Sequence, residues 1–204
     1  MSSSAQHPDS LSANSSTSPE YFETMYAADI DPWNFETSQY EKDKYAATIA
    51  ALPKQQYRSA FEIGGSIGVL TERLSARCQS LLSVDVSTRA QARAKERCQH
   101  LPQVEFKVMQ IPHKYPAQLF DLTLVSEVGY YWGEKDFPVA QQQIADHLEP
   151  GGHLLLVHWT PYVEEYPRTG DSVHEAFLQQ VGTVYRALLS KREERYRLDL
   201  LERL

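Results

Sequence analysis

The chain has no run of about eighteen apolar residues, which is the length that a membrane-spanning helix requires. Its first residues also lack the basic stretch and apolar core of a secretory signal. Only two cysteines occur, Cys78 and Cys98, and this fits a reducing compartment. These absences predict a cytoplasmic protein that does not enter a membrane.

Metal-binding patterns and basic clusters are missing as well. The two cysteines do not form a close pair, and the histidines do not fall at the spacing of ligands on a helix, so no metal site is expected. The formal net charge is -7, without a clustered basic face, which argues against nucleic acid or an anionic membrane as the main partner. An acidic surface suits a neutral or cationic small molecule, although it can also serve solubility alone.

The length of 204 residues is enough for one α/β domain with a sizeable core and short for two. Residues 1–18 are rich in serine and poor in apolar residues, which predicts a disordered tail, and the domain is expected over residues 19–204. Residues 19–55 predict two helices that form a lid over a ligand cleft. The second helix begins with a capping box, in which Ser38 and Glu41 satisfy each other's backbone amides.

Apolar runs that end in polar residues alternate with helical patterns in the rest of the chain. They lie at residues 61–63, 81–84, 104–109, 120–125 and 154–157, the last after a turn signal at 149–152. Strands separated by helices pair in parallel through right-handed crossovers. Residues 195–200 favour a further strand, antiparallel to one near 183–189, with a C-terminal helix as the alternative. The predicted fold is therefore α/β, with a Rossmann-like seven-stranded, mostly parallel sheet and helices on both faces.

The most informative stretch is the glycine-rich bend after the first of these strands. It reads Glu62-Ile63-Gly64-Gly65-Ser66-Ile67-Gly68. Glycines let the backbone turn sharply and approach a ligand closely. About twenty residues later Asp85 ends the second strand, which is the spacing at which a carboxylate reaches ribose hydroxyls. Two adjacent strand ends are thus expected to converge on one nucleoside.

These features resemble the class I S-adenosylmethionine-dependent methyltransferases, from about Tyr21 to the C-terminus. The first motif of that family is acid-x-Gly-x-Gly-x-Gly, and here Ser66 replaces its middle glycine while a glycine stands one place earlier. Asp85 matches the ribose-binding acid of the family. Gln110 stands where the family usually has an acid that holds the adenine amino group, and its side-chain carbonyl can still accept that hydrogen bond. The resemblance implies S-adenosyl-L-methionine as cofactor and S-adenosyl-L-homocysteine as product.

A closer resemblance lies in the flanking segments. Asp31-Pro32-Trp33, residues 40–45, residues 126–131, His158-Trp159 and residues 170–174 look like the nodulation protein S family. That family methylates the amino group of chitooligosaccharide signal precursors, which implies N-methylation of an amino sugar or another small amine. The motifs and the resemblance together give these cofactor-binding residues: Trp33, Tyr40, Lys44, Glu62, Gly64, Gly65, Ser66, Gly68, Asp85, Val86, Gln110, Ile111 and Ser126.

Methyl transfer is an in-line attack on the sulfonium methyl, which requires alignment and a free lone pair on the nucleophile. An aliphatic ammonium has no such lone pair, so an amine must bind neutral or lose its proton to a base. Candidate catalytic residues are Glu127, His158 and His174, all expected at the C-terminal edge of the sheet. Each has a structural alternative, as a carboxylate paired with the lid or as a packed histidine. Tyr40 and Lys44, four apart on one helix face, can reach the methionine carboxylate together.

Tyr130 and Tyr131 are the expected substrate-binding residues. Their rings can stack on a sugar or stabilise the sulfonium by cation–π attraction, or they can simply close the edge of the sheet. The expected partner is a small-molecule acceptor, and the oligomeric state does not follow from the sequence. Two alternatives stay open: an O-methyltransferase on a small metabolite, and a nucleoside-binding module without catalysis, which the changes at Ser66 and Gln110 make conceivable.

Overall fold

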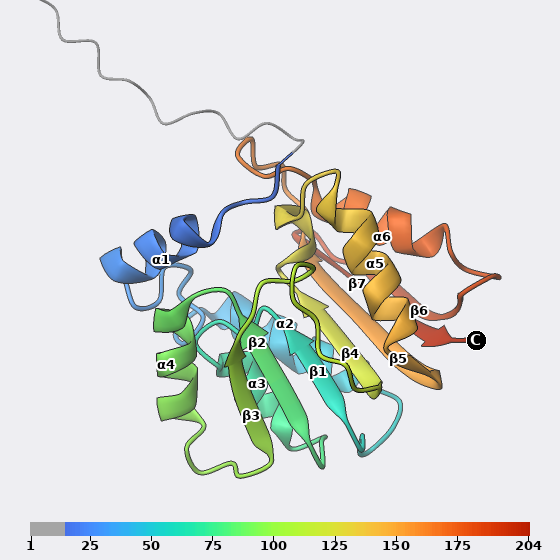
Figure 1. Cartoon of the computed structure of the whole chain (residues 1–204), viewed down its shortest axis with the longest axis horizontal. Helices are drawn as coiled ribbons and strands as arrows, with labels where there is room; N and C mark the ends of the chain where they lie inside the picture. The colour runs from blue at the N-terminus through green and yellow to red at the C-terminus, as the bar shows by residue number, and fades with distance from the viewer. Residues whose placement is uncertain (1–14) are drawn as a thin grey trace, which may run out of the picture.

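The structure, a computed structural model, describes residues 15–204 and is built on a seven-stranded sheet (Figure 1). The strand order is β3-β2-β1-β4-β5-β7-β6. Strands β1 to β5 pair in parallel, and β7 runs antiparallel to both β5 and β6. The predicted fold class is confirmed. The strands are β1 (Ala60–Ile63), β2 (Leu81–Asp85), β3 (Val104–Val108), β4 (Phe120–Ser126), β5 (Leu148–Trp159), β6 (Tyr185–Arg192) and β7 (Tyr196–Arg203).

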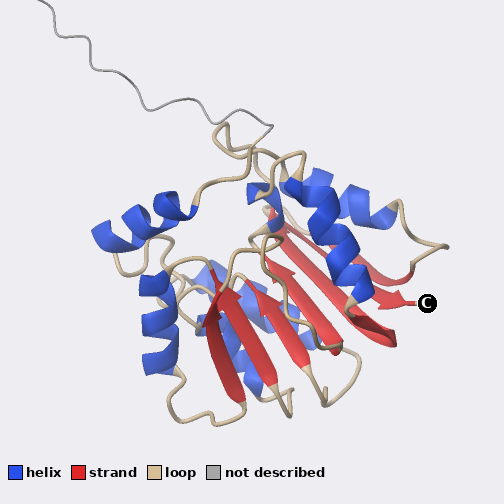
Figure 2. Ribbon diagram, in the orientation of Figure 1, coloured by secondary structure: helices blue, strands red, loops and turns tan. Residues whose placement is uncertain are grey.

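Helices cover both faces of this sheet (Figure 2). In the view of Figure 1, α5 and α6 lie in front of the sheet, and α2 and α3 lie behind it. A short 3₁₀ helix, η1, follows β4 and contacts α6. The helices are α1 (Pro19–Ala28), α2 (Gln39–Ala50), α3 (Val69–Ser75), α4 (Thr88–Arg97), η1 (Gly129–Tyr131), α5 (Asp136–Asp146) and α6 (Gly170–Leu178). None of the helices in the described part of the chain is long and apolar enough to cross a membrane.

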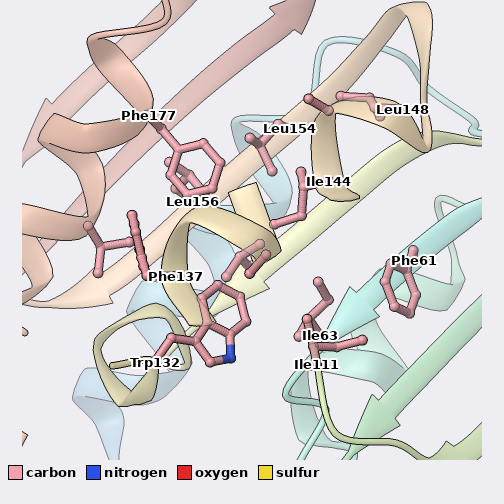
Figure 3. Packing of buried hydrophobic residues seen from close by; sticks show 14 of the residues in the cluster. Phe61, Ile63, Ile111, Trp132, Phe137, Ile144, Leu148, Leu154, Leu156 and Phe177 are labelled. Atoms are coloured by element: carbon pink, nitrogen blue, oxygen red, sulfur yellow. The ribbon is translucent and has the colours of Figure 1, made fainter. Parts of the chain in front are cut away.

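Each face of the sheet buries its own apolar layer, because successive side chains of a strand point to opposite faces. On β4, Leu122 and Leu124 pack into the layer with α2 and α3, whereas Val125 packs into the layer with α5 and α6. Figure 3 shows the second layer, where Ile144 of α5 and Phe177 of α6 lie over the strands. Strands buried on both faces explain why these segments read as nearly continuous apolar runs.

One expectation about the strands differs from the structure, and one alternative is excluded by it. The turn predicted at residues 149–152 lies inside β5, where the pairing with β4 jumps from Phe120 opposite Leu148 to Leu122 opposite His153. The extra residues of β5 form an irregularity in its pairing with β4 and do not form a separate turn before the strand. At the C-terminus, the antiparallel pair of strands is found and the helical alternative is wrong, because β6 and β7 pair from Tyr185 to Arg203.

The helices α1 and α2 lie in different positions relative to the sheet, although the sequence predicts that both form a lid. Ser38 caps α2 by accepting a hydrogen bond from the Glu41 backbone N–H at 3.3 Å, which is one half of the predicted capping box. The other half is wrong, because the Ser38 N–H donates to the Asn34 carbonyl at 2.9 Å and the Glu41 carboxylate pairs with Lys44. Tyr45 and Thr48 of α2 are buried, and α2 contacts α3, so α2 belongs to the helical layer behind the sheet. α1 lies to the side of the strands' carboxyl ends, where it contacts α4, and the first turns of α2 reach the same edge through Tyr40 and Lys44.

The predicted disordered tail, residues 1–18, lies mostly outside the described residues. From Ser15 onwards the chain packs against the domain: the Thr17 N–H donates to the Tyr131 carbonyl at 2.9 Å, and the Ser16 hydroxyl accepts from the Gly133 N–H at 2.9 Å. A side chain at Gly133 would meet the backbone of Ser15 at 2.5 Å. Residues 15–18 are therefore fixed by contacts that the composition of the segment does not reveal.

Candidate active site

A cavity of about 410 Å³ lies at the carboxyl ends of β1 to β4. This is the point where the strand order reverses between β1 and β4, at which open α/β sheets bind their ligands. Most of the predicted site residues line the cavity, and they come from the ends of β1 to β4, from α2 and the segment before it, and from η1. They are Trp33, Tyr40, Lys44, Gly64, Ser66, Asp85, Val86, Gln110, Ile111, Ser126, Glu127, Tyr130 and Tyr131.

The glycine-rich bend forms the floor of the cavity next to β1. Gly64 has φ of +85°, and a Cβ there would come within 2.0 Å of the Val128 side chain, so only glycine fits. Ser66 also has a positive φ, 49°, although it is not a glycine. Its hydroxyl lies 2.5 Å from the hydroxyl of Tyr26 on α1. The serine that departs from the family motif thus joins the bend to the helix beside the cavity.

Three predicted cofactor residues lie beneath the bend rather than in the cavity lining. The Glu62 carboxylate accepts hydrogen bonds from the hydroxyls of Thr71, at 2.5 Å, and Ser83, at 2.7 Å. Burial raises the pKa of Glu62, while these two hydroxyls act in the opposite direction. Gly65 lies against Ser83 and Gly68 against α4, with φ of +82° at Gly68. Glu62, Gly65 and Gly68 therefore shape the bend from below.

Asp85 lies at the end of β2 and faces the cavity. Its carboxylate accepts hydrogen bonds from the backbone N–H groups of Ser66 and Ser87, both at 2.9 Å. Burial raises the pKa of Asp85 to about 6, although these two amides lower it. The carboxylate therefore braces the glycine bend and keeps acceptor capacity for a ligand, since a carboxylate offers about four lone-pair sites. Gln110 and Ile111, which follow β3, lie on the same side of the cavity.

Glu127 occupies the opposite part of the cavity, directly after β4, with a positive φ of 55°. One carboxylate oxygen lies 2.6 Å from the Lys44 ammonium. The other accepts hydrogen bonds from the Tyr130 hydroxyl at 2.7 Å and from the Trp159 backbone N–H at 2.8 Å. Lys44, 2% exposed, also pairs with Glu41 at 3.0 Å. Lys44 therefore lies between two carboxylates, and Arg195 is a second cation in the same part of the lining.

Ionisation within this cluster follows from its geometry. Burial lowers the pKa of Lys44, but Glu127 and Glu41 outweigh it and raise the pKa above the usual value. Burial raises the pKa of Glu41, with Lys44 acting against it. Lys44 is therefore charged and already committed to two carboxylates, so it is less available to an anionic ligand than the sequence suggests.

Aromatic rings wall the cavity around Glu127. Tyr130 stacks on Tyr166 with ring centroids 4.9 Å apart, and Tyr131 meets Phe22 of α1 edge to face at 4.8 Å. Such offset and edge-to-face pairs fix ring orientations as well as burying area. Tyr166 lies in the loop between β5 and α6 and Phe22 in α1, so tertiary contacts, not neighbouring sequence, complete this wall.

His158 and His174 are fully buried and do not line the cavity. His158 lies on β5, and its Nδ1 is 3.0 Å from Nε2 of His174 on α6. Nδ1 of His174 lies 2.6 Å from the Asp199 carboxylate on β7. The structure thus joins the two histidines to each other and to Asp199, and it separates them from the place where a ligand would bind.

Several further lining residues are not among the site residues that the sequence predicts. Tyr26 and Phe22 come from α1, Trp159 from the end of β5, and Arg195 from the turn before β7. The Arg195 guanidinium lies 5.9 Å from the centre of the Tyr40 ring. Only the order of the strands brings this turn beside α2, so no local pattern could have identified Arg195.

The sheet order, the glycine bend and the cavity at the carboxyl ends define the Rossmann-like fold of the S-adenosylmethionine-dependent methyltransferases. A solved structure of this fold, N-methyltransferase NodS from Bradyrhizobium japonicum WM9 in complex with S-adenosyl-L-homocysteine, superposes with a TM-score of 0.80. It is 22% identical, and the match covers 90% of this chain and 97% of that chain.

The family model of nodulation protein S matches residues 19–158. Nodulation protein S from Rhizobium tropici is 32% identical over 132 residues, and that from Azorhizobium caulinodans is 32% identical over 160 residues. The first match covers 64% of this chain and 55% of the relative, so the chain spans little more than half of that protein's length. The second covers 74% of each. The chain belongs to the nodulation protein S family.

The buried histidines predict a pH dependence of stability. Burial lowers the pKa of His158 well below the usual 6.5, and burial also lowers that of His174 despite Asp199. As the pH falls below 6.5, the unfolded chain takes up protons that the folded protein excludes. The free energy of unfolding should then fall by at most about 1.4 kcal/mol per pH unit for each histidine.

Urea unfolding at about pH 7.5 and pH 5.5 measures this change in the free energy of unfolding. The parent protein and the variant His158→Leu are measured under the same conditions. The difference between the two proteins removes contributions from other groups, Asp85 among them. The variant should lose less unfolding free energy between the two pH values. An equally steep loss in both proteins would contradict the assignment.

Proposed function

We propose that the protein is an S-adenosyl-L-methionine-dependent methyltransferase that methylates the nitrogen of a small amine, with an amino sugar as the finer candidate. The observation that carries the proposal is the pairing, in one cavity, of a nucleoside-type end at Asp85 and an aromatic end that holds the Glu127 carboxylate. Membership of the nodulation protein S family supports it. So does the related fold of an N-methyltransferase that binds S-adenosyl-L-homocysteine.

The cofactor is expected to lie along the carboxyl ends of β3, β2 and β1. Asp85 would accept hydrogen bonds from the ribose hydroxyls, which is the usual role of an acid at this strand end. The Gln110 side-chain carbonyl would accept from the adenine amino group, with Val86 and Ile111 on either side of the ring. The bare backbone at Gly64 would let the methionine part pass towards β4.

The methionine carboxylate has a donor in Tyr40. Within the described residues, the Tyr40 hydroxyl is a buried group without a hydrogen-bond partner. Its pKa is raised to about 12, chiefly by burial, so it stays protonated and can donate. Arg195 beside the ring can add charge, and Lys44 is already paired with two carboxylates. We therefore assign the carboxylate to Tyr40 and Arg195 and give Lys44 the role of holding Glu127 in place.

Nitrogen is favoured over oxygen as the nucleophile by the bases that the cavity offers. An alcohol needs a base to remove its proton, whereas a neutral amine already has a lone pair. Both candidate imidazoles lie outside the cavity lining, and Glu127 is the candidate base that lies beside the aromatic wall. Its negative charge suits an incoming ammonium, and the Tyr130 hydroxyl bonded to it fixes its direction. An amine acceptor is therefore the better match, with the O-methyltransferase as runner-up.

The direct test is transfer of labelled methyl from S-adenosyl-L-methionine to a panel of acceptors. The panel should contain deacetylated chitooligosaccharides, simple aliphatic amines and hydroxylated compounds without nitrogen. We expect labelled amines. Labelling of the hydroxylated compounds alone would overturn N-methylation, and binding of S-adenosyl-L-homocysteine without any transfer would support the nucleoside-binding module instead.

Asp85→Asn should weaken the binding of S-adenosyl-L-homocysteine by about 1.5–3 kcal/mol, roughly 10- to 150-fold in Kd, because charge-assisted hydrogen bonds to ribose are lost. Isothermal titration calorimetry measures the change. Asp121→Asn is the matched control, since Asp121 also caps backbone amides, of Arg58 and Ser59, but at the opposite end of the sheet. Unchanged affinity in the Asp85 variant would refute the ribose assignment.

Glu127→Gln should lower kcat by about 100-fold and change the affinity for S-adenosyl-L-homocysteine little, because the amide keeps the shape but not the charge that faces the acceptor. Steady-state methylation of the best amine from the panel gives kcat. Glu149→Gln serves as control, since Glu149 is paired with Arg58 far from the cavity. A Glu127 variant with full kcat would remove this residue from the mechanism.

A further inference from the structure

A continuous chain of buried hydrogen bonds crosses the domain from β7 to η1. It runs from Asp199 to His174 at 2.6 Å, from His174 to His158 at 3.0 Å, and from His158 to the backbone N–H of Gly129 at 3.1 Å. The three side chains are 0% exposed. They come from β7, α6 and β5, and the chain ends on η1, which borders the cavity. Every nitrogen of the two imidazoles has a partner in this series, as buried polar groups require, whereas the second carboxylate oxygen of Asp199 has no hydrogen-bond partner among the described residues.

The direction of every bond in this chain is fixed by its first donor. The Gly129 N–H can only donate, so Nε2 of His158 must accept and the proton of His158 lies on Nδ1. His158 therefore donates to Nε2 of His174, whose own proton lies on Nδ1 and is donated to the Asp199 carboxylate. Both imidazoles are neutral, and both of their lone pairs are occupied. Neither histidine can act as the base that the sequence suggests.

The charge of Asp199 supports the direction in which His174 donates to it. Burial would raise the pKa of Asp199, but the hydrogen bond from His174 and the charge of Arg197 lower it below its usual value. The Arg197 guanidinium lies 3.0 Å from the same carboxylate oxygen that His174 contacts. Asp199 is thus an ionised anchor, and an ionised acceptor makes the stronger hydrogen bond.

The end of the chain at Gly129 sets the position of the cavity wall. A side chain on Gly129 would meet Val173 at 2.6 Å and Nε2 of His158 at 3.0 Å, so η1 lies directly against the histidine. The next residue, Tyr130, has its ring 5.5 Å from that of His158 and its hydroxyl bonded to Glu127. A shift of η1 would therefore move Tyr130 and release one of the hydrogen bonds that hold Glu127.

We propose that Asp199, His174 and His158 form a positioning relay that holds η1, and through it Tyr130 and Glu127, in the geometry that the acceptor meets. The relay makes no contact with the ligand itself. The effect of the relay on turnover rests on the proposed function. The hydrogen bonds of the relay and their directions do not depend on that function. The relay gives these buried polar residues a role in placing the acceptor rather than in proton transfer.

The test compares two replacements of His158. In His158→Gln the side-chain carbonyl can still accept from the Gly129 N–H, whereas in His158→Leu the acceptor is lost and the volume is kept. We expect His158→Leu to lower kcat by at least about 10-fold, because small displacements of a positioned group cost that much or more. The Kd for S-adenosyl-L-homocysteine should stay within about twofold, and His158→Gln should restore most of kcat.

Two measurements on the full chain need no turnover. Imidazole nitrogen chemical shifts should show His158 and His174 neutral with the proton on Nδ1 between about pH 5.5 and pH 8. Hydrogen exchange at the Gly129 amide should be slow in the parent protein and in His158→Gln, and fast in His158→Leu. Thermal unfolding shows whether each variant still folds. If His158→Leu does not fold, His158→Gln is compared with the parent protein alone.

The outcomes separate the relay from the proposed function. Full kcat in a folded His158→Leu protein, equal losses in both variants, or a proton on Nε2 of His158 would overturn the relay. If no amine is methylated by the parent protein, the proposed function fails while the nitrogen shifts and the Gly129 exchange still decide whether the relay exists. If both hold, the relay and the acceptor chemistry are established independently.

Discussion

The carboxylate of Glu127 is the contact on which the arrangement of the site depends. It receives an ammonium from α2, a hydroxyl from η1 and a backbone N–H from the end of β5, so one side chain after β4 joins three other elements. A partly buried carboxylate without such partners would be unfavourable, and the positive φ of Glu127 is a backbone strain that the surrounding contacts must also offset. Since strain at such positions is often kept where function needs it, the location of Glu127 beside the aromatic wall accords with a role towards the acceptor.

The cavity divides its tasks between its two ends in a way that follows from the strand order. Parallel strands bring Gly64, Asp85 and Gln110 to one edge of the sheet, and the reversal between β1 and β4 opens room beside them. At this end, backbone amides and one carboxylate dominate. At the other end, aromatic rings and Glu127 dominate, and the rings belong to α1, η1 and the loop before α6. A nucleoside suits the first environment and a small cationic amine suits the second.

Much of the fold could be predicted because its signals are local. Strands buried on both faces read as apolar runs, and the antiparallel pair at the C-terminus shows its own alternation. The bounds of β5 could not be predicted in this way, because residues 149–152 read as a turn and yet remain within the strand as an irregularity of its register. The place of α2 was also beyond local patterns, since its burial depends on the contacts of Tyr45 and Thr48 with the layer behind the sheet.

The glycine bend and Asp85 follow from the amino-acid sequence alone, because a turn that needs positive φ and a strand that ends in an acid are properties of a few adjacent residues. The tertiary structure alone decided that Glu62 lies under the bend, that Lys44 is bound between two carboxylates, and that Arg195 reaches the cavity. It also decided the direction of the chain from Asp199 to Gly129. Those partners lie far apart along the chain, and only the packing of β5, α6 and β7 against η1 brings their donors and acceptors within hydrogen-bond distance.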